Sequence, residues 1–238
     1  MRSGQGARVA RKLATLGYTL PSLIGYARHV RAVLVCMVVL AAACDRGAAK
    51  GDPSGSGSGT ASNDDSEREQ ARFDAERRPD KVIEALGIKP GSRVADIGAG
   101  SGLLTVHLAR AVAPNGKVVA TDVDGAVLTL LEQRLKAANL ANVVERRVVA
   151  ADTPGLEPAT YDAILLAEVD HYFTDAPAWL KAAGTALKPG GRIVISNRIY
   201  HQQQSMANAK KAGLVLLTQS TPVPTHFIAV FTVGESKK

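Results

Sequence analysis

The segment from Val94 to Gly102, which reads VADIGAGSG, constrains the fold of this chain more than any other feature. In it, an apolar stretch typical of a buried strand runs directly into three closely spaced glycines. Such a turn needs residues without a β-carbon, because the backbone must bend tightly and let a ligand approach its amide groups. The glycines alone are weak evidence, but a strand that ends in such a turn is typical of α/β folds that bind nucleotides.

Strand and helix patterns alternate around this turn. A charged helical stretch at residues 67–78 precedes it, and Pro79 is expected to separate that stretch from the next helix. Strands that are separated by helices imply a parallel sheet with both faces covered. The expected helices are 81–86, 103–111, 126–138 and 177–187, and the expected strands are 93–97, 117–121, 143–150, 161–167 and 192–196.

The last part of the chain breaks this alternation. Residues 215–219 and 226–233 read as two strands joined by a short loop that contains proline and leaves no room for a helix. Two such strands form a hairpin, so one of them must run antiparallel. The sequence therefore predicts an α/β, Rossmann-like fold with a seven-stranded, mostly parallel sheet, an antiparallel strand in the C-terminal hairpin, and helices on both faces.

Asp122 adds a second ligand signal. It lies twenty residues after Gly102, at the end of the second expected strand. A carboxylate in this place can accept both hydroxyl protons of an adenosine ribose. The turn and the acid together predict a site for a ligand that contains a nucleoside.

The signature Asp96-Ile97-Gly98-Ala99-Gly100-Ser101-Gly102 resembles that of the class I methyltransferases, which use S-adenosylmethionine. The resemblance extends over about 150 residues, from Asp80 to Val233. The segment Leu187-Lys188-Pro189-Gly190-Gly191-Arg192 is similar to the family's turn into its fifth strand, and an antiparallel strand near the end of the chain fits too. The resemblance implies an enzyme that takes a methyl group from S-adenosylmethionine.

From this resemblance we expect nine residues at the cofactor. The three glycines would pass under its methionine and ribose portions, Asp122 would hold the ribose hydroxyls, and the residue after it would pack against adenine. Asp152 is expected at the adenine amine, and Glu168 at the methionine end. The full set is Asp96, Gly98, Gly100, Gly102, Asp122, Val123, Asp152, Thr153 and Glu168.

An NAD-binding domain is the nearest alternative, because it shares the strand, the glycine turn and the ribose acid. It prefers the spacing GxGxxG, whose third glycine would stand one place later, where this chain has Leu103. The C-terminal hairpin and the Leu-Lys-Pro-Gly-Gly turn also favour the methyl donor over NAD.

Glu168, Asp170, His171 and Tyr172 follow the fourth expected strand, at the carboxyl edge where open α/β sheets bind ligands. His171 is a candidate for taking a proton from the methyl acceptor, and Asp170 is a candidate for orienting that acceptor. The alternative is that His171 only caps the strand or closes the cofactor pocket. The donor methyl is already electrophilic, so the protein mainly has to align the acceptor and exclude water.

The acceptor is expected to be a small molecule. Residues 200–211, with three consecutive glutamines, form either a short lid or a polar helix, and the sequence leaves both open. Asp170 and His171, together with His107 or His201, suggest a metal only weakly, because no helical ligand spacing supports one. No metal is therefore predicted.

The net charge of +7 is concentrated in the first 44 residues, which hold six Lys or Arg and no acid. The rest of the chain has 23 basic and 22 acidic residues and is nearly neutral, which argues against a nucleic-acid partner. Both cysteines, Cys36 and Cys44, also lie in this first segment, so the domain has neither an internal disulfide nor a cysteine metal site.

Residues 1–43 have the architecture of a signal peptide, with basic residues ahead of an apolar run at 32–43. The run is shorter than the roughly 20 residues that span a bilayer. Its end, Ala41-Ala42-Ala43-Cys44, resembles a bacterial lipoprotein signal that leaves Cys44 to carry lipid, although Ala41 stands where a larger aliphatic residue is commoner. The alternative is a buried apolar helix with an incidental cysteine. Residues 44–66, with a Gly-Ser run, are expected to be a flexible tether, and residues 67–238 the methyltransferase domain.

The two halves of the chain conflict, because the signal would export a domain whose methyl donor is made in the cytoplasm. One resolution is a start near Val30 or an anchor that leaves the domain facing inward, as a cytoplasmic methyltransferase. The other is an exported lipoprotein that binds a nucleoside-like ligand without catalysis. In that case Asp45, directly after Cys44, resembles the signal that retains lipoproteins at the periplasmic side of the inner membrane.

Overall fold

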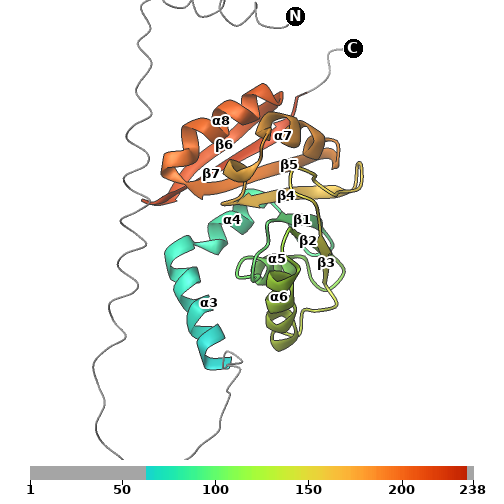
Figure 1. Cartoon of the computed structure of the whole chain (residues 1–238), viewed down its shortest axis with the longest axis vertical. Coiled ribbons are helices and arrows are strands. Elements are labelled where there is room, and N and C mark those ends of the chain that lie inside the picture. Colours follow the sequence, from blue (N-terminus) through green and yellow to red (C-terminus); the bar gives the residue numbers. More distant parts are fainter. Residues whose placement is uncertain (1–62, 235–238) are drawn as a thin grey trace, which may run out of the picture. The chain divides into compact units, whose positions relative to one another are not determined.

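A seven-stranded mixed sheet forms the centre of residues 63–234, the part of the chain that this computed structural model describes (Figure 1). The strands lie in the order β3-β2-β1-β4-β5-β7-β6. They are β1 (Arg93–Ile97), β2 (Lys117–Asp122), β3 (Val144–Val148), β4 (Tyr161–Ala167), β5 (Leu187–Arg198), β6 (Leu214–Val223) and β7 (His226–Val233). Neighbours are parallel from β3 to β5, whereas β7 is antiparallel to both β5 and β6. The predicted fold class, with its C-terminal hairpin, is confirmed.

Helices cover both faces of the sheet (Figure 1). One buried hydrophobic cluster joins the sheet to α4, α5 and α6, and a second joins the opposite face to α7 and α8. Val94 belongs to the first cluster and Ala95 to the second, because successive strand residues point to opposite faces. The elements are α3 (Asn63–Arg77), α4 (Pro79–Leu86), α5 (Thr105–Val112), α6 (Gly125–Ala137), α7 (Ala176–Gly184) and α8 (Gln202–Lys211), with short 3₁₀ helices η2 (Asp170–Tyr172) and η3 (Ile199–His201).

The strand order reverses at β1, which lies between β2 and β4. From this point the chain proceeds outward along one half of the sheet through β2 and β3, and along the other half through β4 and β5. A crevice forms outside the carboxyl ends of the strands at such a point. The residues that follow β1, β2 and β4 therefore meet at one edge of the sheet.

Several boundaries differ from the predicted ones. The helix expected from residue 103 begins at Thr105, because the turn after β1 continues up to it. The helix expected to reach Leu187 ends at Gly184, and β5 begins at Leu187 instead. Residues 202–211 form α8, so the polar-helix alternative describes this stretch correctly.

The N-terminal boundary of the folded part also lies earlier than expected. Because α3 begins at Asn63, residues 63–66 belong to a helix rather than to the expected tether. As predicted, Pro79 separates two helices, and Arg78 between them has left-handed backbone with φ 50°. The expected signal at residues 1–43, the lipid-bearing Cys44 and the rest of the tether lie outside the described residues. No helix within residues 63–234 is both long and apolar enough to cross a membrane.

Candidate functional site

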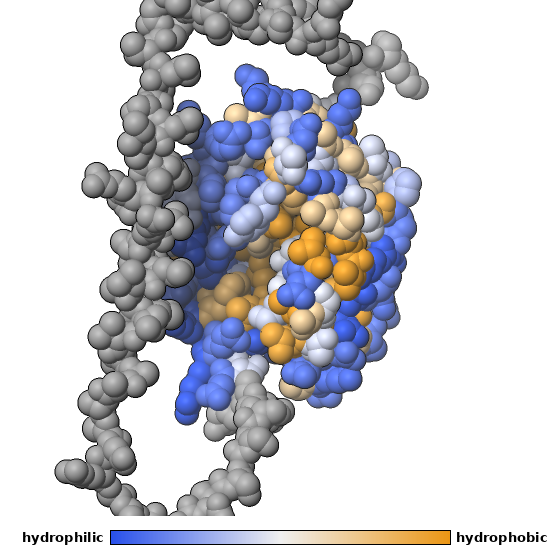
Figure 2. Space-filling model, viewed as in Figure 1, coloured by the Kyte–Doolittle hydropathy of each residue, from blue (hydrophilic) through white to orange (hydrophobic). Residues whose placement is uncertain are grey.

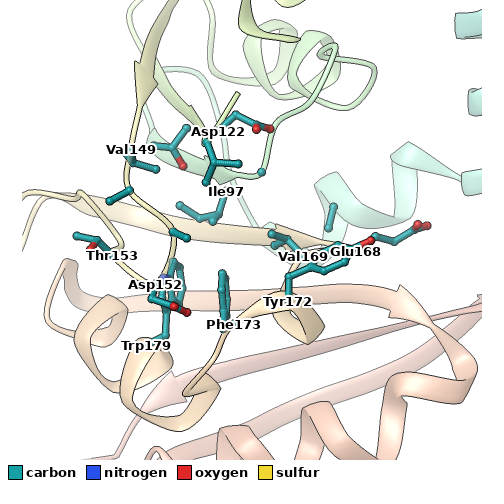
Figure 3. A pocket seen from close by; sticks show the side chains of 16 residues that line it. Ile97, Asp122, Val149, Asp152, Thr153, Glu168, Val169, Tyr172, Phe173 and Trp179 are labelled. Atoms are coloured by element: carbon teal, nitrogen blue, oxygen red, sulfur yellow. The ribbon is translucent and has the colours of Figure 1, made fainter. Parts of the chain in front are cut away.

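A cavity of about 340 Å³ lies at the carboxyl ends of β1, β2 and β4, where the strand order reverses (Figure 3). The fold brings residues from five separate stretches of the chain to its walls. Six of the nine residues expected at the cofactor line it, and they are Gly98, Asp122, Val123, Asp152, Thr153 and Glu168.

A second cavity, of about 250 Å³, lies between α3 and the glycine turn. The remaining three expected residues, Asp96, Gly100 and Gly102, line this second cavity. Gly98, Ala167 and Glu168 line both cavities. The two spaces are therefore neighbours, and together they suit an elongated ligand that passes Glu168.

The glycines of the turn are required by their backbone and their surroundings. Gly98 and Gly102 have φ values of +67° and +88°, where other residues are strained. A β-carbon on Gly98 would lie 2.8 Å from Val169 Cγ2, and one on Gly102 would lie 2.2 Å from Leu131 Cδ1. Packing and backbone geometry thus both account for the spacing that the sequence shows.

The Asp122 carboxylate connects β2 to this turn. Its Oδ2 accepts a hydrogen bond of 2.9 Å from Gly100 N, and its Oδ1 accepts one of 3.1 Å from Asp124 N. Each carboxylate oxygen has a further lone pair, so the group can still accept hydroxyl protons from a ligand. The neighbouring Thr121 Oγ1 is buried, belongs to a residue that lines the cavity, and has no hydrogen-bond partner within residues 63–234. A buried hydroxyl of this kind calls for a partner that the described residues do not supply.

Asp96 is buried beneath the turn, at the side of the second cavity. Its Oδ2 accepts a hydrogen bond of 2.7 Å from Thr105 Oγ1 at the start of α5. Burial raises the pKa of Asp96 to about 7, against the lowering effect of the Thr105 hydroxyl, and the nearby charge of Asp122 adds to the rise. Asp96 therefore fixes the helix start to the strand end.

Asp152 has its carboxylate held by the loop before α7. Oδ1 accepts from Thr174 N and Oδ2 accepts from Thr174 Oγ1, both at 2.7 Å, and these bonds lower the pKa of Asp152. The residue itself has a φ of +54°. Its role at an adenine amine remains a prediction, and in the described structure it fastens one wall of the cavity.

Phe173 and Trp179 form a cavity wall that no sequence pattern predicted (Figure 3). Their rings are stacked, with centroids 4.2 Å apart and planes inclined by 10°. Trp179 lies in the first turn of α7 among apolar residues, so its pattern is that of an ordinary core residue. Phe173 lies in the segment between the fourth strand and α7, and this position is the one signal that could have pointed to the site. Val123 and Tyr172 are exposed and border the same cavity. Figure 2 shows that one face of the folded part carries hydrophobic residues between hydrophilic margins.

Glu168 is surrounded by basic side chains that no sequence pattern related to it. Its Oε1 contacts Arg77 Nη1 and lies 2.8 Å from His226 Nε2, and its Oε2 lies 3.6 Å from Arg198 Nε. Burial alone would raise the pKa of Glu168, but Arg77, His226 and Arg198 outweigh burial and lower it. These partners come from α3, β5 and β7, far away in sequence, and only the folded sheet brings them together.

Asp170 does not face the cavity. It is 2% exposed, and its carboxylate accepts hydrogen bonds from Asn197 Nδ2 at 2.6 Å and Ser205 Oγ at 2.5 Å. Asp170 thereby ties η2 to β5 and α8. Both oxygens are engaged inside the protein, which argues against direct contact with an acceptor, and the orienting role of Asp170 remains a prediction.

His171 is oriented through the same network. Asn197 Nδ2 lies 3.0 Å from His171 Nδ1, and Asn197 Oδ1 accepts a hydrogen bond from Arg198 N. An amide nitrogen only donates, so Nδ1 is the accepting nitrogen and the neutral ring carries its proton on Nε2. Burial, followed by the neighbouring His201, lowers the pKa of His171, which favours the neutral ring. The ring then offers a donor rather than a base, which argues against proton removal, and the role of His171 at the site remains a prediction.

Residues 63–234 contain no group of three or more His, Cys, Asp or Glu side chains that could hold a metal ion. His107, one of the histidines considered for such a site, has its Nε2 2.7 Å from Asp74 Oδ1 and so joins α5 to α3. The absence of a metal cofactor remains a prediction.

Residues 95–193, less than half of the chain, match a protein family described as a methyltransferase domain. A ubiquinone/menaquinone biosynthesis C-methyltransferase, UbiE, from Teredinibacter turnerae is 34% identical over 114 residues. This match covers 48% of the present chain and 46% of that protein. The chain thus spans less than half the length of the curated relative it matches.

Two solved structures have a similar fold. A methyltransferase dependent on S-adenosylmethionine from Aquifex aeolicus gives a TM-score of 0.63 at 21% identity, covering 69% of this chain and 95% of that one. An O-methyltransferase from Thermotoga maritima gives a TM-score of 0.57 at 23% identity, covering 68% and 66%. At these identities the likeness establishes the fold.

Proposed function

We propose that the folded part of this chain binds S-adenosylmethionine and transfers its methyl group to a small-molecule acceptor. One observation carries the proposal: Asp122, the first glycine of the turn and Thr121, whose buried hydroxyl has no partner within residues 63–234, all line one cavity at the point where the strand order reverses. The match of residues 95–193 to a methyltransferase domain supports it.

The residues present fit this donor. Asp122 has the free lone pairs that ribose hydroxyls need, and Thr121 supplies a buried hydroxyl without a partner among the described residues. Val123, Phe173 and Trp179 offer apolar surface for a flat base. The second cavity, between Arg77 and the glycine turn, would receive the methionine end.

When bound, S-adenosylmethionine would supply a methyl carbon that its sulfonium makes electrophilic, so that an electron pair of the acceptor could displace the thioether sulfur, which would keep the electrons of the broken carbon–sulfur bond. The protein's part is to align the acceptor and to exclude water. Phe73 and Arg77 of α3 border the site on one side, and Tyr172 and Phe173 border it on the other. The acceptor proton passes to solvent, because His171 presents a donor.

The name of the relative from ubiquinone/menaquinone biosynthesis supports a small acceptor. The names do not fix the atom that is methylated, since one protein is a C-methyltransferase and another an O-methyltransferase. The first test is calorimetric titration of the purified chain with S-adenosylmethionine and, separately, with NAD. We expect binding of the methyl donor only. Binding of NAD alone would overturn the proposal, and binding of neither would favour an exported fold without catalysis.

We also propose that Cys44 carries lipid and holds the domain at a bacterial membrane, on the periplasmic side of the inner membrane. The support is the sequence Ala41-Ala42-Ala43-Cys44 with its preceding apolar run. Cells that express the chain and its Cys44→Ser variant would be labelled with radioactive palmitate and fractionated. Label and membrane association that vanish in the variant are expected. An unlabelled, soluble parent chain would overturn the proposed lipid anchor.

A further inference from the structure

Four side chains form a charged cluster around Glu168, and two of them, Arg198 and His226, line neither of the cavities assigned to the donor. Arg77, Glu168, Arg198 and His226 converge there from α3, the end of β4, the end of β5 and the start of β7. Glu168 lines both cavities and lies at their shared border. The cluster therefore stands beside the place where an acceptor must approach the donor.

The cluster carries one unbalanced positive charge. The basic surroundings of Glu168 lower its pKa and keep it ionised. Burial, followed by the charge of Arg77, lowers the pKa of His226 and keeps that ring neutral near pH 7. Two guanidinium groups then face a single carboxylate.

Of the two guanidinium groups, that of Arg198 is less closely paired with the Glu168 carboxylate. Its side chain is 54% exposed, and its Nε is 3.6 Å from Glu168 Oε2, so this pair is longer than the contacts of Glu168 with Arg77 and His226. Arg77 is more deeply placed, with a side chain that is 19% exposed and a buried Nε that has no hydrogen-bond partner within the described residues. An anion beside Arg198 would find a planar fork of donors suited to a carboxylate.

A row of aromatic rings runs beside the cluster. Tyr172 lies 4.0 Å from His171, His171 stacks on His201 at 4.1 Å, and Tyr200 lies 4.4 Å from His201, all between ring centroids. Tyr172 lines the first cavity and is 76% exposed, and Tyr200 is 70% exposed. Exposed rings of this kind present flat faces to a flat ligand.

We propose that the charged cluster and this row of rings form the acceptor subsite, and that the acceptor is an aromatic acid, a flat ring that bears a carboxylate. The inference rests on the proposed methyl transfer and names its substrate class. The single unbalanced charge matches a monoanion such as a carboxylate rather than a dianionic phosphate. Arg198 holds the carboxylate, the rings hold the arene, and the Nε2–H of His171 supplies a further donor.

The test is calorimetry on the full chain saturated with S-adenosylhomocysteine, titrated with 4-hydroxybenzoate and with its neutral counterpart 4-hydroxybenzamide. We expect the acid to bind at least about tenfold more tightly, the effect of one hydrogen bond to a charged group. Arg198→Gln should remove this preference, and Arg198→Lys should restore part of it. Arg78→Gln is the matched control, because Arg78 is similarly exposed, at 46%, but pairs with Asp80.

Equal affinity for the acid and the amide, or no binding of the acid, overturns the inference. So does an Arg198→Gln variant that weakens S-adenosylhomocysteine itself, since the cluster would then belong to the donor. Failure of the parent chain to bind S-adenosylhomocysteine is a different result, seen before any acid is added. It removes the proposed function, and the inference falls with it.

Discussion

The guanidinium of Arg77 and the carboxylate of Glu168 form an ion pair between residues 91 positions apart in sequence. This pair fastens α3 beside the glycine turn. The other contacts of α3 are also largely polar: Gln70 Nε2 donates to Leu103 O at 3.0 Å, and Arg134 Nη2 lies 2.6 Å from Glu69 Oε2. We predict that Arg77→Gln raises amide hydrogen exchange in residues 66–77 about tenfold, because a partly buried ion pair is lost.

The control for this exchange experiment is Arg72→Gln, whose side chain is 79% exposed and pairs only within α3, with Glu76. It should leave exchange at the end of α3 near the parent value. Unchanged exchange in the Arg77 variant would show that α3 is held by other contacts.

The Asp122 carboxylate is predicted to control donor affinity. Asp122→Ala removes the acceptor of ribose hydroxyls and the partner of Gly100 N, so we expect binding of S-adenosylhomocysteine to fall by more than about tenfold. Trp179 is the only tryptophan of the chain and lines the same cavity, so its fluorescence can report binding. Asp80→Ala, on the surface of α4, is the control. Equal affinity in the Asp122 variant and the parent would remove the ribose assignment.

Two glycines of the turn should respond differently to substitution. Gly102→Ala brings a β-carbon within 2.2 Å of Leu131 Cδ1 at a φ of +88°, and we expect it to cost about 3 kcal/mol or more. Gly100→Ala meets nothing within 4 Å and should cost about 1 kcal/mol, from its left-handed backbone alone. Urea denaturation of both variants measures the difference, and similar losses would contradict the packing argument.

Asp96 makes stability depend on pH. Because its pKa rises from 3.8 to about 7 on folding, the folded state holds a proton that the unfolded state loses between these values. Its contribution is fully present below pH 3.8 and disappears as the pH rises to about 7. Asp96→Asn should therefore gain stability relative to the parent over this range, by up to about 4 kcal/mol, and level off above it. Unfolding free energies at pH 5, 6, 7 and 8 test this, and a constant difference between the two proteins would refute it.

The fold was predictable from the sequence because its signals are local. The strand at Arg93–Ile97 and the hairpin of β6 and β7 each follow from a run of neighbouring residues. The same holds for the glycine turn and for Asp122, since a turn and the end of a strand can be recognised along the chain. All nine residues expected at the cofactor consequently line one of two neighbouring cavities.

The proposed acceptor side could not be predicted in the same way. Arg77, Arg198 and His226 carry no mark in sequence that relates them to Glu168, because strand order and the docking of α3 create their contacts. The tautomer of His171 depends on Asn197, 26 residues away. Asp170 stands beside other polar residues in the sequence and therefore looked functional. Its partner Ser205 lies on α8, a helix that the sequence did not predict unambiguously.

The polar attachment of α3 bears on how such a protein can evolve. Phe73 makes its apolar contact with the core, and its other contacts with the domain are ion pairs and amide hydrogen bonds. Mutations on the polar side of this helix can therefore change the residues that border the site without changing the packing of the two hydrophobic clusters. The residues that shape the rim of the site are therefore different from the residues that stabilise the fold. Related chains with this architecture can change the substrate they accept while they keep the same sheet.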